Sequence, residues 1–166
     1  AMISKYRNTG QTCVCANRLL VHDKVYDAFA AKLVEATKKL KTGQGFEEGV
    51  TQGPLINKDG LEKVERLVAD AKAKGAKVML GGARHERGGT FYQPSVIGDA
   101  TTEMECAQEE IFGPVAMLFR FKDEDEAIKI ANGTPYGLAA YFYSRDIGRV
   151  WRVAEKLHYG IVGINE

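Results

Sequence analysis

The sequence of 166 residues predicts an α/β fold, with a mostly parallel sheet and helices on both of its faces. The first observation is that short apolar segments of strand character alternate with segments of helical periodicity. The second is composition: 45% hydrophobic and 27% charged residues are typical of a globular protein. The third is length, because a chain of this size forms one domain with a real core.

The first part of the chain predicts a strand and a helix. Leu19–Val21 has the character of a buried strand, and Asp23 is a plausible N-cap for the helix that follows. Gly43 and Gly45 end this helix and open a loop. Its expected buried face consists of apolar residues at spacings of three and four, namely Val25, Phe29, Leu33, Ala36 and Leu40.

A second helix and a strand follow the loop. Asn57 is the expected N-cap of the helix, and Gly75 is its expected C-terminal stop. Lys77–Leu80 is a short strand closed by Gly81 and Gly82. The expected buried face of the helix is Leu61, Val64, Leu67, Val68 and Ala71.

The middle of the chain is less regular. Residues 84–89 are polar and rich in glycine, which predicts a surface turn. Residues 91–97 form an extended stretch, in which Pro94 favours an edge strand or a bend over a central strand. The acidic segment from Thr101 to Glu110 predicts one or two helical turns.

The last third predicts three strands separated by two helices. The strands are 115–121, 139–143 and 161–164, and the helices are 123–132 and 147–157. The first of these helices opens with four acidic residues, which the helix dipole favours at an N-terminus.

Several classes of function are disfavoured by charge and composition. A formal net charge of +1 gives no electrostatic case for nucleic acid or an anionic membrane surface. No apolar run is long enough for a membrane span, and no signal peptide is visible. Three cysteines form no disulfide framework, and the three histidines have no metal-ligand spacing. We expect a cytoplasmic protein, with a mitochondrial location left open.

Cys13 is the candidate catalytic residue. It follows a Gly-Gln-Thr turn, where glycine permits a close backbone approach and N–H groups can point at an oxyanion. A thiolate in such a turn can attack a carbonyl carbon, with the Cys13 N–H as an oxyanion donor. The alternative is a small buried apolar residue, a common role of free cysteine.

Two motifs carry a resemblance to a known family. Residues 6–18 read Tyr-Arg-Asn-Thr-Gly-Gln-Thr-Cys-Val-Cys-Ala-Asn-Arg, and residues 109–114 read Glu-Glu-Ile-Phe-Gly-Pro. Both resemble signatures of the aldehyde dehydrogenase superfamily, and the first is most similar to its succinate-semialdehyde dehydrogenase branch. Further matches at 53–56, 133–138 and 160–165 follow in the order of the family, so the resemblance covers the whole chain.

The resemblance implies NAD(P)-dependent oxidation of an aldehyde through a thiohemiacetal and a thioester on Cys13. It also implies that Glu110 binds the ribose on the nicotinamide side and that Phe112 packs near that ring. A carboxylate suits vicinal hydroxyls because it offers two acceptor oxygens. The alternative for Glu109 and Glu110 is a solvated acidic turn.

Arg7 and Cys15 are the other two site residues that the resemblance implies. In the semialdehyde branch, an arginine at the position of Arg7 holds the distal carboxylate of the substrate, for which a guanidinium is well shaped. The alternative is a surface arginine. Cys15 is a candidate redox partner that forms a disulfide with Cys13, or else it packs below the loop.

The resemblance also implies that residues 1–166 are a single, incomplete catalytic domain. The dinucleotide-binding domain, the general base, the C-terminal substrate loop and the oligomerisation strand are expected outside it, and no Gly-x-Gly-x-x-Gly loop is present. The Glu-x-Gly-Gly sequence at Glu86–Gly89 has the form of the family's base motif, but it follows the nucleophile and is flanked by charge, so we reject it. We expect this chain alone to be inactive and the parent enzyme to be a homo-oligomer.

Two other functions remain open. The main hypothesis names succinate semialdehyde, or a close relative such as glutarate semialdehyde, as the substrate. The first alternative is a general aldehyde dehydrogenase with a different substrate range. The other is a non-catalytic thiol or redox module that uses Cys13 and Cys15. Both NAD and NADP remain candidates for the cofactor, because the residues that read the ribose 2′ position are expected elsewhere.

Overall fold

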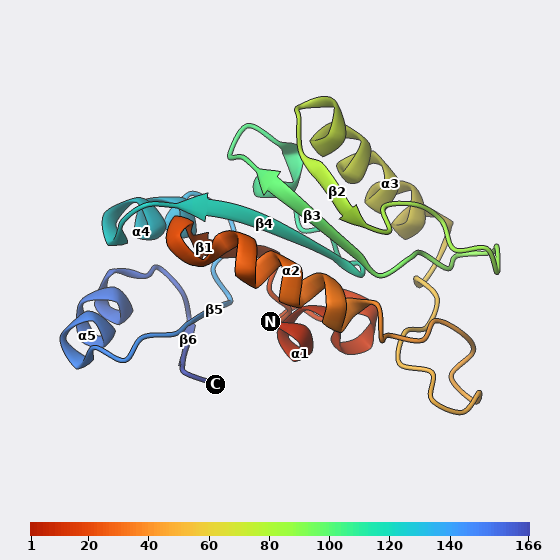
Figure 1. The fold of residues 1–166 in the computed structure, drawn as a ribbon, viewed down its shortest axis with the longest axis horizontal. Coiled ribbons are helices and arrows are strands. Elements are labelled where there is room, and N and C mark those ends of the chain that lie inside the picture. Colours follow the sequence, from red (N-terminus) through yellow and green to blue (C-terminus); the bar gives the residue numbers. More distant parts are fainter.

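A computed structural model describes all 166 residues and is built around a four-stranded sheet (Figure 1). The strand order is β1 (Arg18–His22), β4 (Val115–Phe121), β3 (Ser95–Ala100) and β2 (Lys77–Leu80). β1, β4 and β3 run parallel, and β2 pairs antiparallel with β3. The predicted, mostly parallel sheet is confirmed.

Two helices cover opposite faces of this sheet, α2 (Tyr26–Thr37) and α3 (Lys58–Ala73) (Figure 1). Side chains alternate between faces along a strand, and β4 shows this directly. Met117 and Phe119 join the cluster beneath α3, whereas Ala116 and Leu118 join the cluster beneath α2. β4 is therefore buried on both faces, which explains its continuous apolar sequence.

The predictions for α3 are confirmed in detail. The Asn57 side chain accepts a hydrogen bond from the N–H of Gly60 at 2.9 Å and caps the helix. Gly75 follows the helix with a φ of +96°, a conformation that favours glycine. The buried residues are the predicted Leu61, Val64, Leu67, Val68 and Ala71.

The predicted cap and buried face of α2 are partly wrong. A 3₁₀ turn, Asp23–Val25, precedes the helix, and His22 Nδ1 accepts the N–H of Lys24 at 3.1 Å, whereas the Asp23 carboxylate binds Arg120. The turn delays the helix to Tyr26 and shifts its phase, so that Val25 is 55% exposed. The buried residues are Tyr26, Ala30, Leu33 and Thr37.

The edge position predicted from Pro94 is also wrong. β3 lies between β4 and β2, inside the sheet, and begins at Ser95. Pro94 therefore stands just outside the ladder, where its lack of an N–H costs no strand hydrogen bond. The acidic segment before β4 contains a short 3₁₀ helix, Glu105–Ala107, as expected of one helical turn.

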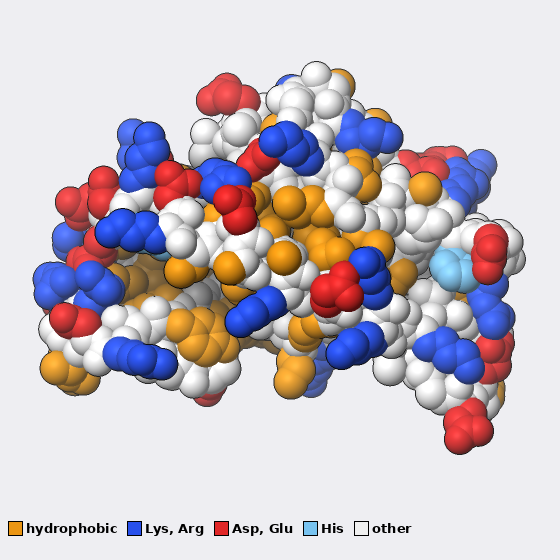
Figure 2. Space-filling model, viewed as in Figure 1, with side chains coloured by type: hydrophobic (Ala, Val, Ile, Leu, Met, Phe, Trp, Pro, Cys, Tyr) orange, Lys and Arg blue, Asp and Glu red, His pale blue; other side chains and the backbone are white.

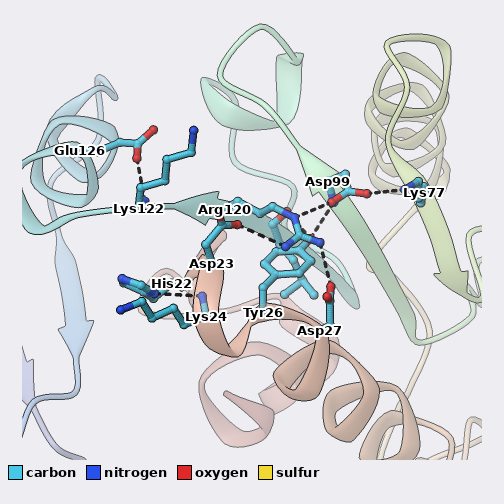
Figure 3. Close-up of polar contacts among 11 residues, drawn as sticks. His22, Asp23, Lys24, Tyr26, Asp27, Lys77, Asp99, Arg120, Lys122 and Glu126 are labelled. Carbon is cyan, nitrogen blue, oxygen red and sulfur yellow. Dashed lines mark hydrogen bonds and ion pairs between the residues drawn. The ribbon is translucent and has the colours of Figure 1, made fainter.

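A network around Arg120, at the end of β4, ties the elements of the sheet together (Figure 3). Its guanidinium lies 3.6 Å from the centre of the Tyr26 ring. The same group donates to Asp99 at 3.0 Å, to Asp27 at 2.8 Å and to Asp23 at 3.3 Å. Because these carboxylates come from β3, from the 3₁₀ turn Asp23–Val25 and from α2, one side chain joins three elements to β4.

The last part of the chain forms a separate layer (Figure 1). It contains α4 (Glu124–Asn132), β5 (Ala139–Phe142), α5 (Ile147–Lys156) and β6 (Ile161–Ile164). β5 and β6 form their own two-stranded parallel sheet, so the expectation of one sheet fails here.

Neither α4 nor α5 contains a buried residue. Apolar side chains lie on the surface over this layer (Figure 2), and Ile147 and Trp151 are 71% and 65% exposed. No helix of the chain has both the length and the apolar character needed to cross a membrane.

Candidate active site

Cys13 lies on a strained loop, residues 7–17, which we call the nucleophile loop. The loop follows α1 (Met2–Tyr6) and opens with a 3₁₀ turn, Arg7–Gly10. Asn8, Thr9 and Gly10 adopt φ values of 49°, 58° and 73°, so three consecutive residues are left-handed. Such backbone is costly for residues other than glycine and persists only where the surroundings impose it.

Hydrogen bonds from distant segments impose this shape. Thr9 Oγ1 accepts the N–H of Gly53 at 2.9 Å. Gln11 accepts the N–H of Ile56 at 2.9 Å and donates to the carbonyl of Pro54 at 3.2 Å. The segment 53–56, which the sequence singled out as a minor motif, is therefore the support of the nucleophile loop.

The two main motifs meet in space at a pair of glycines. A Cβ added to Gly10 would lie 2.6 Å from the carbonyl carbon of Gly113, closer than any real side chain tolerates. Gly10 also has a positive φ, so two independent constraints require glycine there. The nucleophile loop and the segment 109–114 are thus in backbone contact.

Asn17 links the same two segments and was missed from the sequence. Its Oδ1 accepts the N–H of Ile111 at 2.9 Å. Its Nδ2 donates to the carbonyls of Cys106 at 2.9 Å and of Glu109 at 3.4 Å. One amide side chain therefore fixes the position of the 106–111 segment relative to the nucleophile loop, and no sequence pattern signals this role.

Cys13 is the exposed cysteine of the three. Its backbone N–H donates no hydrogen bond within the chain, which leaves it available to an oxyanion. Cys15 is half-buried, and its thiol donates to the carbonyl of Arg7 at 3.6 Å. Cys106 is buried, and burial raises the pKa of its thiol to about 11, which disfavours it as a nucleophile.

Arg7 lies at the start of the nucleophile loop, six positions before Cys13. Its side chain is exposed and forms no ion pair with any carboxylate of this chain, so its guanidinium is free to bind an anion. The structure brings Arg7 and Cys15 into direct contact through the Arg7 carbonyl.

The two glutamates before the Ile-Phe-Gly-Pro sequence differ in their partners. Glu109 binds Arg66 at 2.7 Å, whereas the half-buried carboxylate of Glu110 accepts no hydrogen bond from this chain. Arg66 also pairs with Glu105 and so holds the start of the segment against α3. The free carboxylate is the one that the sequence selected for a ribose.

Phe112 has a φ of 54° and is half-buried. The Nζ of Lys63, from α3, lies 5.9 Å from the centre of its ring. Sequence reasoning did not single out Lys63, because its relation to Phe112 depends on how α3 packs. Lys63 adds a cation beside the candidate cofactor residues.

Glu86 lies where the sequence predicted, on an exposed turn between β2 and β3. Its neighbour Arg87 binds Glu47 at 2.7 Å on the surface. No cluster of histidine, cysteine, aspartate and glutamate side chains could hold a metal ion.

Comparison with known proteins gives consistent matches along the whole chain. Residues 1–166 match the model of the aldehyde dehydrogenase family. Succinate-semialdehyde dehydrogenase [NADP(+)] of Escherichia coli is 58% identical, and 3-sulfolactaldehyde dehydrogenase of Pseudomonas putida is 56% identical. Each match covers 99% of this chain and 34% of the relative.

A solved structure supports the fold. The crystal structure of succinate-semialdehyde dehydrogenase from Burkholderia pseudomallei matches with a TM-score of 0.98 at 60% identity. The match covers 99% of this chain and 34% of the crystallised one. The chain therefore spans about a third of the length of the relatives it matches.

Proposed function

Since the chain belongs to the aldehyde dehydrogenase family, we propose that the enzyme carrying it oxidises succinate semialdehyde, or a close semialdehyde such as glutarate semialdehyde, to the carboxylic acid. One observation carries this proposal. The exposed Cys13 thiol lies on a strained loop in backbone contact with the segment that presents the free carboxylate of Glu110.

Cys13 performs the covalent chemistry in this proposal. Its thiolate adds to the aldehyde carbon, and the free backbone N–H of Cys13 stabilises the oxyanion that forms. Loss of a hydride from that carbon leaves a thioester on the sulfur. Water then cleaves the thioester, releases the acid and restores the thiol. The base that activates this water is proposed to lie outside residues 1–166.

The proposed cofactor is NAD or NADP, whose nicotinamide accepts a hydride when bound. The residues of this chain fit such a group. The carboxylate of Glu110 has no internal partner and offers two acceptors to ribose hydroxyls, and Phe112 presents a half-buried ring beside it. We propose that the dinucleotide-binding domain belongs to another part of the enzyme, so that residues 1–166 alone are inactive.

Arg7 is the proposed ligand for the far end of the substrate. The names of two relatives, succinate-semialdehyde dehydrogenase and 3-sulfolactaldehyde dehydrogenase, describe aldehydes that carry a distal anion, a carboxylate or a sulfonate. An exposed guanidinium without an internal ion pair suits either anion. The proposal includes a homo-oligomeric enzyme, in the cytoplasm or in mitochondria, with no nucleic-acid or membrane partner.

Cys15 is the proposed redox partner of Cys13. An oxidant such as a peroxide would remove two electrons and two protons from the thiol pair and form a disulfide, which would block the nucleophile. The Cys15 sulfur would have to leave its hydrogen bond with the carbonyl of Arg7. A Cys15→Ala variant is then expected to lose recovery of activity by a reductant after peroxide treatment.

Replacing Cys13 by alanine tests the proposed reaction. In the full-length enzyme, Cys13→Ala is expected to lower kcat for succinate semialdehyde by at least about a thousandfold, because the covalent route is lost. Cys106→Ala is the matched control, since that thiol is buried in the core cluster beneath α3. Similar rates for the Cys13 variant and the parent enzyme would contradict the mechanism.

Replacing Arg7 by glutamine tests the proposed substrate. The variant is expected to raise KM for succinate semialdehyde by about 10- to 100-fold, because a charged hydrogen bond to the carboxylate is lost. The KM for pentanal, which lacks the carboxylate, is expected to stay within about twofold. An equal change for both aldehydes would exclude Arg7 as the carboxylate ligand.

A further inference from the structure

A tyrosine hydroxyl from the layer of α4, β5, α5 and β6 reaches the nucleophile loop. Tyr141, on β5, is half-buried, and its hydroxyl donates to the carbonyl of Val14 at 3.0 Å. Val14 directly follows Cys13 in the sequence, whereas Tyr141 lies 127 positions away from Val14. The proposed mechanism gives this contact no role.

The neighbouring strand determines where the Tyr141 ring lies. β5 pairs with β6, and Tyr141 stands opposite Gly163 in the register. A Cβ added to Gly163 would lie 2.6 Å from a ring carbon of Tyr141. The ring therefore occupies the space that a side chain at position 163 would need.

Arg18, the residue after the nucleophile loop, attaches the same layer at a second point. Its guanidinium donates to the carbonyls of Ile130 and Ala131 at 2.7 Å each, at the C-terminal end of α4. Hydrogen bonds from a charged donor are stronger than neutral ones. The layer that carries Tyr141 is thus held to the chain on both sides of Cys15, Ala16 and Asn17.

Two peptide groups connect the Tyr141 hydroxyl to the proposed oxyanion donor. The Val14 carbonyl shares its peptide group with the N–H of Cys15, which donates to the carbonyl of Thr12 at 2.8 Å. The Thr12 carbonyl shares its peptide group with the N–H of Cys13, which is free. The hydrogen bonds therefore form one series, from the Tyr141 hydroxyl to the Cys13 N–H.

Such a series acts on its last donor in two ways. A hydrogen bond to a carbonyl polarises the peptide group and makes its N–H a stronger donor, so that successive bonds strengthen one another. The bonds also fix the planes of both peptide groups, because each group is rigid. An oxyanion donor is most effective when it already points at the place where the negative charge develops.

We propose that Tyr141 is a positioning residue whose hydroxyl strengthens and aims the Cys13 N–H as the oxyanion donor. This rests on the proposed role of that N–H. Tyr141 acts through the two peptide groups, so its hydroxyl affects only those reactions of Cys13 that place a negative charge on an oxygen.

Two reagents separate the oxyanion from the thiol in the full-length enzyme. With 4-nitrophenyl acetate, the Cys13 thiolate forms a C–S bond, the carbonyl electron pair moves to oxygen, and the oxyanion then collapses and expels 4-nitrophenolate. With iodoacetamide, the thiolate displaces iodide in one step, and no oxyanion forms. Absorbance of 4-nitrophenolate gives the first rate and intact mass gives the second, each corrected for the rate measured with Cys13→Ala.

Tyr141→Phe removes the hydroxyl and keeps the ring beside Gly163. We expect acylation by 4-nitrophenyl acetate to slow roughly tenfold and alkylation by iodoacetamide to stay within about twofold, because only acylation needs the oxyanion donor. Tyr159→Phe is the matched control, since that hydroxyl donates at 2.6 Å to Ala131 in the same layer. Both of its rates should equal those of the parent. Equal slowing of both reactions by Tyr141→Phe, or no slowing of either, would overturn the proposal.

Gly163→Ala is a second variant, which keeps the hydroxyl but forces the Tyr141 ring to move. It is expected to lower the ratio of the acylation rate to the alkylation rate. Combined with Tyr141→Phe, it should lower the ratio no further, because the hydroxyl is already absent. Fully additive effects of the two substitutions would contradict the proposed series.

Neither reagent needs a semialdehyde or a nicotinamide cofactor, so this proposal and the proposed function can fail separately. A parent enzyme that does not oxidise succinate semialdehyde, but shows the expected effect of Tyr141→Phe on acylation, would refute the proposed function alone. Equal values of kcat/KM for succinate semialdehyde in an active parent and in Tyr141→Phe would refute the role of Tyr141 and leave the proposed function in place.

Discussion

The helices α3 and α5 carry the same local signals but differ in what covers them. Each has an apolar face in its sequence, and each begins with a side-chain cap, Asn57 or Asp146. α3 buries five apolar residues against the main sheet, whereas α5 buries none. Periodicity and capping therefore predict that a helix forms and which side is apolar, but the contribution of that helix to stability depends on its partner surface.

Replacement of one apolar residue on each helix should give the largest difference. Leu67→Ala is expected to lower the free energy of unfolding by about 2–5 kcal/mol, because Leu67 is fully buried and its loss leaves a cavity. Trp151→Ala should change it by less than about 0.5 kcal/mol, because Trp151 is 65% exposed. Urea unfolding of the 166-residue chain measures both. Equal decreases in the free energy of unfolding for the two variants would mean that another surface covers Trp151 of α5 in solution.

Removal of the two caps should give an intermediate difference. Asn57→Ala is expected to cost about 1 kcal/mol of global stability, because the cap bond to Gly60 is lost on a helix that belongs to the core. Asp146→Ala removes the corresponding bond to Arg149 at 2.6 Å from a helix outside the core. We expect faster hydrogen exchange within α5 and almost no change in the urea midpoint. A global loss as large as that of Asn57→Ala would refute the separation of the two regions.

Replacement of one arginine in each region should give the smallest effects. Arg120→Lys loses the stacking on Tyr26 and part of a network of three carboxylates, so we expect a small decrease in the urea midpoint. Arg152→Lys, which alters a surface pair with Glu124, should cost close to nothing. Lys77 and Arg120 lower the pKa of Asp99. The stability that the Asp99 carboxylate contributes is therefore present near neutral pH and is lost as the pH falls into the acid range. A larger loss for Arg152→Lys would reverse the order of the two regions.

Local patterns predicted much of the fold. The strands β2, β4 and β6, the cap of α3 and its five buried residues followed from apolar spacing and from asparagine and glycine signals. The predicted buried face of α2 was partly wrong because a 3₁₀ turn precedes the helix. The edge position predicted from Pro94 was wrong because β3 begins at Ser95, one residue after the proline. Periodicity did not separate β5 and β6 from the main sheet, since pairing is decided by contacts distant in sequence.

The candidate site was predictable only where a motif stands in one segment. Cys13 and Glu110 were found by their neighbours in the sequence, although their roles remain predictions. Asn17 and Lys63 were not found, because each acts through a partner 49 or more positions away in the sequence. Side chains that position other groups leave no local signal.

The close approach of Gly10 and Gly113 has a consequence for protein engineering. Because no side chain fits between Gly10 and Gly113, the distance between the backbones of the two segments cannot change independently in either one. A chimera that takes residues 7–17 from a distant homologue would contain a loop whose shape fits the homologue's own counterpart of residues 109–114. Such a graft should work best when the donor's counterpart of residues 109–114 is transplanted with it, so the smallest exchangeable module is a pair of segments almost a hundred residues apart.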